Sequence, residues 1–226
     1  IKSLNPNIII NCIGIIKQLK ESKDPILSLE INSLFPHKLA KYCEDKNTRI
    51  IHISTDCVFS GSKGDYNEHD SPDANDLYGK SKHLGELVNY DNCLTIRTSI
   101  VGHELKSSVS LLNWFLAQKK KVYGYTNAIY SGFTTNEICN IIVNNIIPKP
   151  GLKGLYHLSS HPIDKYKLLM LFAKHYKKEI EILKREDFYT NKTLNGDRFL
   201  KDFSYERKSW DLMVKEMSMS FKRDQI

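Results

Sequence analysis

The sequence has 226 residues, which is enough for one large domain or two smaller ones. Hydrophobic residues make up 41% of it and charged residues 26%, a composition that argues against an intrinsically disordered protein. The formal net charge is +7, but lysine and arginine are spread along the chain, so we expect no nucleic-acid partner. The densest basic run, residues 119–121, is typical of a solvated helix end, and a diffuse positive charge suits a diphosphate-bearing substrate.

The five cysteines give no sign of a disulfide framework or a metal site. Their number is odd, and no two of them form a Cys-x-x-Cys pair. We therefore expect no metal and a reducing compartment, the cytoplasm. No apolar run is long enough to span a membrane and no signal peptide is recognisable, so we expect no membrane partner. The first residue is Ile1 rather than Met, and we expect the natural N-terminus to lie upstream.

Strand and helix patterns alternate in the first half of the chain. Two apolar runs, residues 8–12 and 49–54, predict strands that are buried on both faces of a parallel sheet. Between them, a helix is expected over residues 24–42, with Pro36 kinking or restarting it. After a polar loop, the later elements are a helix over 77–88 and a strand over 93–97. This order predicts an α/β fold with a doubly wound, Rossmann-like parallel sheet.

The regular alternation of strand and helix ends beyond Val101. The patterns there predict helices over residues 111–116, 136–147 and 164–176, and a short strand over 155–158. Residues 190–217 are a polar tail with scattered aromatic residues, in which no element is predicted.

Tyr78 and Lys82 are four residues apart, a spacing that places both side chains on one face of the expected helix. A tyrosine has an ordinary pKa of roughly 10, and a nearby lysine ammonium favours the tyrosinate and lowers that pKa. Such a pair can donate a proton to a carbonyl oxygen as hydride arrives. The spacing alone is common, and a bare pair is more often part of a solvated helix face.

Ser54 and Thr55 stand at the carboxyl end of a predicted buried strand. Open α/β sheets bind their ligands at that edge, and a hydroxyl there can hydrogen-bond a substrate carbonyl. The alternative is that Thr55 only caps the following loop. The loop between Thr55 and Tyr78 has a suitable length to bring the two residues to one site, which favours a shared catalytic site.

Three motifs surround these residues: STDCVFSG over residues 54–61, YNE over 66–68 and LYGKSK over 77–82. A Gly-Glu pair, Gly85 and Glu86, comes shortly after. Together they resemble the extended short-chain dehydrogenase/reductases and, more narrowly, the dTDP-4-dehydrorhamnose reductase branch of the sugar-nucleotide-binding enzymes. Further similarity lies in NCIG over 11–14, LTIRTS over 94–99 and GLYHLS over 154–159. The resemblance therefore spans almost the whole chain.

The resemblance implies a reductase that transfers hydride from NADPH or NADH to the C4 ketone of a nucleotide-diphosphate deoxy-sugar, for the synthesis of cell-surface polysaccharide. Tyr78 would be the general acid, Lys82 would bind the nicotinamide ribose and lower the pKa of Tyr78, and Thr55 would hydrogen-bond the reacting carbonyl. The implied cofactor contacts are Asn11, Cys12, Gly14, Ser54, Tyr78 and Lys82. The implied substrate contacts are Asp56, Val58, Phe59, Arg97, Asn127 and Ser131. For Phe59 the alternative is a core position, because an aromatic residue after a strand is commonly buried. A homodimer is left open.

Two positions depart from the family pattern. Cys57 stands where the family usually has Tyr, and Ile100 stands where many members have Trp. A cysteine cannot make the hydrogen bonds of a phenol, so we expect a different sugar-facing pocket. The departures favour a 4-keto-deoxy-sugar nucleotide related to dTDP-4-dehydrorhamnose over that compound itself.

The sequence lacks a Gly-x-x-Gly-x-x-Gly turn, on which the family binds the cofactor pyrophosphate at a helix N-terminus. We therefore expect the first βαβ units of the sheet to be missing and the chain on its own to be an inactive fragment with an aggregation-prone sheet edge. Residues 1–125 are expected to form the C-terminal part of the NAD(P)-binding domain. Residues 126–226 are expected to form a smaller substrate-binding region that is partly interleaved with the sheet.

Two other functions stay open. A sugar-nucleotide epimerase on the same fold would return the hydride to its substrate. A dehydratase is disfavoured, because it normally has Glu at the position of Cys57. A non-catalytic regulatory subunit would be compatible with the absent glycine turn, whereas the intact pair of Tyr78 and Lys82 argues against it.

Overall fold

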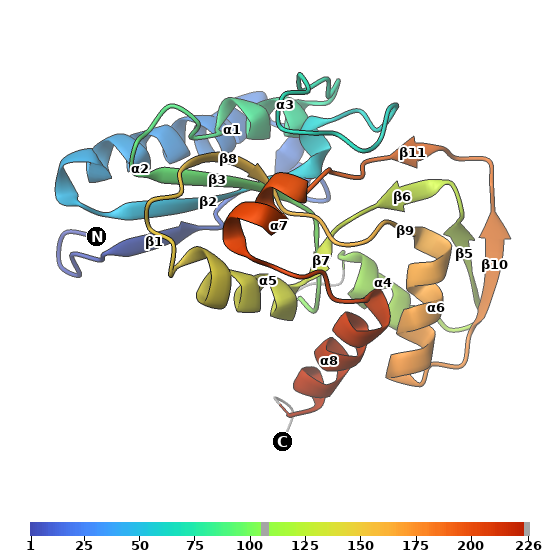
Figure 1. Ribbon diagram of the computed structural model, residues 1–226. Coiled ribbons are helices and arrows are strands. Elements are labelled where there is room, and N and C mark those ends of the chain that lie inside the picture. Colours follow the sequence, from blue (N-terminus) through green and yellow to red (C-terminus); the bar gives the residue numbers. More distant parts are fainter. Residues whose placement is uncertain (105–108, 224–226) are drawn as a thin grey trace. The chain divides into compact units, whose positions relative to one another are not determined.

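The computed structural model describes residues 1–104 and 109–223, and these form two compact units that are interleaved along the chain (Figure 1). The first unit contains residues 1–60, 67–98 and 149–158. The second unit contains residues 61–66, 99–148 and the chain from residue 159 onward. The sequence places the boundary at residue 125. In the structure the first unit instead ends at Thr98, where a strand of its sheet ends, and a later segment, residues 149–158, adds one more strand to that sheet.

The first unit is built on a four-stranded parallel sheet in the order β1-β2-β3-β8. Its strands are β1 (Ile8–Asn11), β2 (Arg49–Thr55), β3 (Cys93–Thr98) and β8 (Gly154–His157). In the central strand β2, Ile51 is paired with Ile10 on one side and with Leu94 on the other. Ile51 is fully buried, as expected for a strand covered on both faces. The α/β class and the parallel sheet predicted from the sequence are confirmed.

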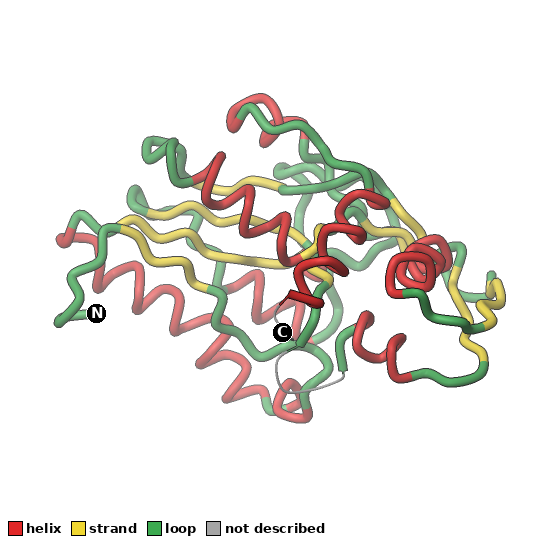
Figure 2. Tube along the Cα trace, turned by 90° about the horizontal axis from the view of Figure 1, so that it is seen from below, coloured by secondary structure: helices red, strands yellow, loops and turns green. Residues whose placement is uncertain are grey.

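Helices α1 (Pro25–Leu29), α2 (Phe35–Cys43) and α3 (Leu77–Leu84) lie over one face of this sheet (Figures 1 and 2). A π-helical stretch, η2 (Glu30–Leu34), joins α1 to α2. The helix therefore continues through Pro36, and the local change is the wider turn before it. Proline has no N–H with which to complete an α-helical turn, so a disturbed turn at this place has a physical cause. Three short 3-10 turns complete the unit: η1 (Lys20–Lys23), η3 (Glu44–Lys46) and η4 (Asp56–Val58).

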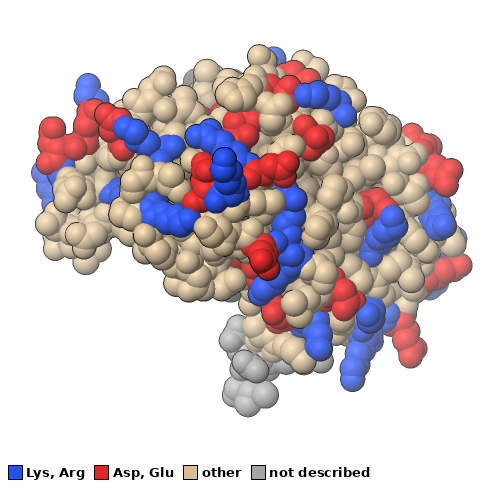
Figure 3. All heavy atoms as spheres, viewed as in Figure 1, with Lys and Arg blue, Asp and Glu red and all other residues tan. Residues whose placement is uncertain are grey.

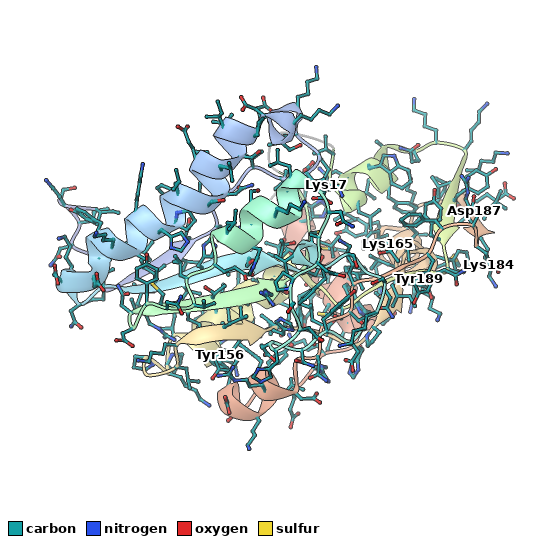
Figure 4. The ribbon with its side chains drawn as sticks, turned by 90° about the horizontal axis from the view of Figure 1, so that it is seen from above. Lys17, Tyr156, Lys165, Lys184, Asp187 and Tyr189 are labelled. Carbon is teal, nitrogen blue, oxygen red and sulfur yellow. The ribbon has the colours of Figure 1, made fainter. Side chains whose placement is uncertain are left out.

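The core under these helices is apolar and small-residue-rich. Ala40 and Cys43 of α2 pack with Ile50 of β2 and with Leu87, which follows α3. On β8 at the other end of the strand order, Tyr156 is also buried (Figure 4). Helix α3 ends at Leu84, four residues before the end expected from the sequence, because Gly85 closes the last turn by donating its N–H to Lys82 O.

The second unit combines small sheets with helices. Its strands are β4 (Ile100–Val101), β5 (Lys121–Tyr125), β6 (Ala128–Tyr130), β7 (Phe133–Thr134), β9 (Ile163–Asp164), β10 (Glu181–Arg185) and β11 (Thr190–Asn191). Its helices are α4 (Leu111–Ala117), α5 (Thr135–Ile141), the π-helical η5 (Ile142–Ile146), α6 (Lys165–Tyr176), α7 (Asp197–Phe203) and α8 (Trp210–Arg223). The strands pair as β10-β5, β11-β6-β9 and β4-β7.

Several elements of this unit differ from the sequence prediction, including β11, α7 and α8 in the tail, where none was expected. Lys121 begins strand β5 rather than ending a helix, and side chains along β5 alternate between exposed and buried. In the polar tail, α8 forms because Met213, Val214 and Met217 recur at helical spacing and are buried. Cations also pack on aromatic rings here. Lys165 Nζ lies 3.8 Å from the centre of the Tyr130 ring, and Figure 4 labels this lysine at the start of α6.

The charges of the protein are mixed rather than segregated on the face seen in Figure 3, where Lys and Arg side chains alternate with Asp and Glu. One exposed ion pair of the second unit joins Lys174 to Asp211 at 2.6 Å. Across residues 1–104 and 109–223, no helix combines the length and the apolar character needed to cross a membrane.

Candidate active site

The carboxyl end of β2 places Thr55 at the start of the turn η4. Thr55 Oγ1 accepts a hydrogen bond from Cys57 N at 3.1 Å and donates one to Asp56 Oδ1 at 3.2 Å. Thr55 therefore does cap the following turn, as the alternative interpretation of the sequence held. Thr55 also lies near enough to the Tyr78 hydroxyl to lower its pKa, and a catalytic site shared by the two residues stays a prediction.

The start of α3 fixes Tyr78 beside this turn. Asp76 caps the helix, because its Oδ1 accepts from Gly79 N at 2.8 Å. A Cβ on Gly79 would lie 2.3 Å from Cys57 O, a distance that no side chain tolerates. Glycine at this position therefore allows the first turn of α3 to press against η4. The close approach brings Tyr78, the neighbouring residue, to Thr55.

Lys82 lies one helical turn further along α3 and is buried. Its Nζ donates to Ile53 O at 2.9 Å, which anchors the ammonium to β2 just before Ser54. Burial lowers the pKa of Lys82 to about 8, although Glu86 and Cys12 raise it in part. The ammonium therefore changes protonation close to neutral pH.

The pKa of Tyr78 is raised rather than lowered. Burial is the main cause, the charge on Cys57 adds to it, and the hydrogen bond with Thr55 offsets part of it. The sequence led us to expect that Lys82 would lower this pKa. In the structure the partial burial of Tyr78 is the main effect, and the groups that add to it or offset it are Cys57, Thr55, Asp56 and Asp76 rather than Lys82. Tyr78 is protonated at neutral pH, as an ordinary tyrosine also is, and its raised pKa makes it a weaker acid than a free phenol.

The loop after β1 approaches the same lysine. A Cβ on Gly14 would lie 3.8 Å from Lys82 Nζ and 3.2 Å from Asn32 Oδ1. At the start of this loop, buried Asn11 donates from Nδ2 to His52 Nδ1 at 3.0 Å and accepts from Ile13 N at 3.2 Å. The loop is therefore held by β2 on one side and faces Lys82 on the other. Cys12 is exposed and is close enough to raise the pKa of Lys82.

Asn32 is a site residue that sequence reasoning missed. It is buried within η2, where its Oδ1 accepts from Ile15 N at 2.8 Å and its Nδ2 donates to Ile15 O at 3.1 Å. The same amide donates to Ser81 Oγ at 3.1 Å. Asn32 thus connects the loop after β1 to the catalytic helix. The signal in the sequence was an asparagine at a core-facing position of an otherwise apolar helix pattern.

A second connection joins the same loop to α3. Lys17 Nζ lies 2.8 Å from Asp76 Oδ2, and Figure 4 labels Lys17 in this loop. Both side chains are largely exposed, so this ion pair contributes little to stability. It does add a contact between the loop and the residue that caps the catalytic helix.

These residues fit the nicotinamide end of a dinucleotide cofactor. Gly14 presents no side chain to the Lys82 ammonium, so a ribose can approach the donor at the place that a Cβ would fill. The buried hydroxyl and ammonium groups are hydrogen-bond partners for ribose hydroxyls. The sequence has no Gly-x-x-Gly-x-x-Gly turn, so the fit concerns the ribose and not the pyrophosphate. Among the described residues, no group of three or more His, Cys, Asp or Glu could hold a metal ion.

Several residues expected to contact ligands are instead buried and engaged with protein. Ser54 Oγ donates to Glu86 Oε1 at 2.8 Å, and Arg97 donates to both oxygens of Glu86 at 2.7 Å. Val58 and Phe59 are fully buried, so the core alternative considered for Phe59 is the one that the structure supports. For Arg97 the geometry favours a structural partnership over the expected substrate contact, because its guanidinium is already paired.

The remaining expected substrate contacts divide between the two units. Asp56 is buried beside Thr55 in the first unit. Ser131 and Asn127 belong to the second unit. There Ser131 Oγ accepts from Leu194 N at 2.9 Å, and Asn127 Nδ2 donates to Glu186 O at 3.0 Å. Their contact with substrate stays a prediction.

Comparison with known proteins places the chain among sugar-nucleotide reductases and their relatives. It is 26% identical to a protein of Salmonella typhimurium named dTDP-4-dehydrorhamnose reductase, over 96% of this chain and 80% of that one. It is 25% identical to a Xenopus laevis protein named methionine adenosyltransferase 2 subunit beta, over 76% of this chain and 55% of that one.

The fold also has solved counterparts. The structure of a dTDP-4-dehydrorhamnose reductase from Bacillus anthracis in complex with NADP matches with a TM-score of 0.82 at 19% identity, covering 97% of this chain and 81% of that one. The model of one family, the RmlD substrate binding domain, matches residues 1–221. That match includes nearly the whole sequence, and the chain belongs to the RmlD substrate binding domain family.

Proposed function

We propose that this protein is a reductase that transfers hydride from NADPH or NADH to the C4 ketone of a nucleotide-linked deoxy-sugar. The observation that carries the proposal is the meeting of Thr55, Tyr78 and Lys82 at the carboxyl end of β2. The names of the reductase relatives support the same chemistry. The reaction would serve the synthesis of cell-surface polysaccharide.

The proposed mechanism assigns one task to each of these side chains. The bound cofactor would supply the hydride. Tyr78, which is protonated at neutral pH, would donate its proton to the carbonyl oxygen, and Thr55 would orient that oxygen by hydrogen bonding. Lys82 and the loop at Gly14 hold the ribose of the cofactor. Lys82 is mostly protonated below its pKa of about 8, which favours the donor role at neutral pH.

The sugar is proposed to be related to dTDP-4-dehydrorhamnose. The Cys57 N–H donates to Thr55 Oγ1, and Cys57 is one of the groups that raise the pKa of Tyr78, so position 57 borders the proposed reacting group. A thiol there leaves more room than the tyrosine usual in the family and offers no phenolic hydrogen bond. These properties support a different substituent on the sugar.

The compartment and assembly are part of the same proposal. All five cysteines are thiols, which supports a reducing compartment such as the cytoplasm. A homodimer is also proposed, and light scattering at micromolar concentration tests it.

A second candidate is a non-catalytic subunit of another enzyme. The relative named methionine adenosyltransferase 2 subunit beta favours it. The two candidates differ in turnover: only the reductase consumes NADPH or NADH when a 4-keto-deoxy-sugar nucleotide is added. An epimerase would form product without net consumption of the cofactor.

The deciding experiment replaces Tyr78 with phenylalanine. Loss of the proton donor should lower kcat for a dTDP- or UDP-linked 4-keto-deoxy-sugar by about 100-fold or more, followed as oxidation of NADPH. The matched control is Tyr90→Phe, since Tyr90 also carries a hydrogen-bonded phenol in the first unit, on His37. The mechanism is wrong if Tyr78→Phe turns over at the wild-type rate.

A further inference from the structure

Glu86 carries a buried carboxylate just after the catalytic helix. Its side chain is only 2% exposed, yet it is fully surrounded by donors. Arg97 donates from Nε to Oε1 and from Nη2 to Oε2, both at 2.7 Å. Ser54 Oγ donates to Oε1 at 2.8 Å, and His83 Nδ1 lies 3.0 Å from Oε2. One carboxylate therefore joins β2, β3 and α3.

The partners of Arg97 extend this network to a third strand. Arg97 Nη1 lies 3.2 Å from His157 Nε2 on β8, and the guanidinium stands 5.1 Å from the centre of the Phe59 ring. His157 N donates to Glu68 Oε1 at 2.9 Å. Burial raises the pKa of Glu86, but the hydrogen bonds from Arg97 and His83 outweigh it and bring the pKa to about 2. The carboxylate is thus ionised at any physiological pH.

The glycine that precedes Glu86 has its own structural reason. A Cβ on Gly85 would lie 1.9 Å from Asn32 O, so only glycine lets the end of α3 approach η2 this closely. That approach sets the direction in which the chain leaves α3 and turns Glu86 toward the sheet. In the Gly-Glu pair, Gly85 therefore allows the close packing that places Glu86 at the sheet.

This network adjoins the proposed catalytic residues both on β2 and on the helix α3. Ser54 immediately precedes Thr55, and Ile53, the residue before Ser54, provides the carbonyl that accepts from Lys82. Glu86 is also one helical turn after Lys82 and is the main group that raises the pKa of that lysine against its burial. The same carboxylate therefore contacts the strand that carries Thr55 and acts on the charge of Lys82.

We propose that Glu86 is a positioning residue for the catalytic pair: held by Arg97 and Ser54, its carboxylate fixes α3 against the end of β2 and stabilises the charged form of Lys82. The role rests on the proposed reductase function. Three titratable groups bear on Lys82 in this arrangement: Cys12 in the loop after β1, His52 on β2, and Glu86 after α3. Of these, Glu86 is the buried carboxylate with a fixed negative charge.

The first test measures the protonation of Lys82 directly. Lysine labelled with 13C at Cε is followed by NMR between pH 6 and 10, and the Lys82→Arg spectrum assigns the signal. The wild-type midpoint is expected at about 8, and Glu86→Gln should lower it by about one pH unit or more. The matched control is Glu137→Gln in the second unit, where an equally buried carboxylate pairs with Lys208 at 2.7 Å. That variant loses a buried charge as well, but it should leave the Lys82 midpoint in place.

The second test is kinetic. At pH 8 a midpoint lowered by one unit reduces the protonated fraction of Lys82, and with it kcat, about fivefold, while KM changes less. Glu86→Asp keeps the charge but is one methylene shorter, so it should keep the midpoint and lower kcat. If Glu86→Gln does not fold, Glu86→Asp decides, and a wild-type kcat would overturn the positioning role.

The two proposals fail in different ways. If the full-length protein reduces no sugar nucleotide, the proposed function is lost, and the NMR midpoint still decides the effect of Glu86 on Lys82. If folded Glu86→Gln keeps the wild-type midpoint, the present inference is lost whatever the activity.

Discussion

His52 shows how a single buried side chain shapes the loop that faces the catalytic lysine. Asn11 donates its amide hydrogen to His52 Nδ1, so the neutral ring carries its own proton on Nε2. Within the part of the chain that the structure describes, Nε2 has no hydrogen-bond partner. Burial, and secondarily the charge of Lys82, lower the pKa of His52 to about 3. A protonated His52 would break its bond with Asn11, because both ring nitrogens would then be donors.

This pKa predicts a specific dependence of stability on pH. The folded protein binds fewer protons at His52 than the unfolded chain, whose histidine titrates at its ordinary pKa of 6.5. The contribution of His52 is therefore complete well above pH 6.5 and is lost as the pH falls. Between pH 6.5 and 5 the free energy of unfolding should drop by about 1.5 kcal/mol from this residue alone. His52→Gln, which can still accept from Asn11, should lack this part of the slope in urea titrations. Parallel curves for the two proteins would contradict the prediction.

The residues that the sequence identified differ in kind from those it missed. Thr55, Tyr78 and Lys82 were recognisable because they share one strand-loop-helix segment and a short motif. Glu86 was recognised only as part of the Gly-Glu pair, and neither it nor Asn32 was given a role, because what defines their roles is their partners. Asn32 bonds Ile15 and Ser81, on either side of it in the chain, and the pairing of Glu86 with Arg97 depends on the register of β3. Such partnerships follow from tertiary packing and leave no periodic signal.

At the scale of elements, α3 is positioned by its two ends rather than by its apolar face. Its start is capped by Asp76 and pressed against Cys57 through Gly79. At its end, Gly85 lies close to Asn32 of η2. Because this contact depends on tertiary structure, the sequence did not reveal it, and the helix was predicted to run to Val88 instead of Leu84.

Asp76 both caps α3 and forms an ion pair with Lys17, and two variants can separate the contributions of these contacts to stability. Asp76→Ala removes both the cap on Gly79 and the ion pair with Lys17, and it should lower the free energy of unfolding by about 1–2 kcal/mol. Lys17→Met removes only the exposed ion pair and should cost less than about 1 kcal/mol. Urea denaturation of both variants at pH 7 compares the two values. Equal losses would show that the ion pair, and not the cap, stabilises this end of the helix.

At the scale of the whole molecule, the first unit and three helical segments of the second, α4, α5 with η5, and α6, were predictable, whereas the short strands and the C-terminal helices of the second unit were not. Parallel strands buried on both faces appear as continuous apolar runs, so β1, β2 and β3 were identified close to their true ends. The second unit is built from strands as short as β7 and β11, which have two residues each. Strand β11 pairs with β6 across some sixty residues of sequence, and such pairing has no local signature.

The position of β1 at the end of the strand order leads to a prediction about association. Ile10 on this strand is 43% exposed, and Ile13 just after it is 55% exposed. An apolar edge strand is a template for pairing with another chain, and a lysine on it opposes that pairing. This chain should therefore form species larger than a dimer as its concentration rises in light scattering, and Ile10→Lys should suppress them. Val143→Lys is the matched control, because it removes an apolar side chain that is 57% exposed, more than Ile10, from the helical segment η5 rather than from a strand. If both variants reduce association equally, general surface charge rather than the edge of β1 is the cause.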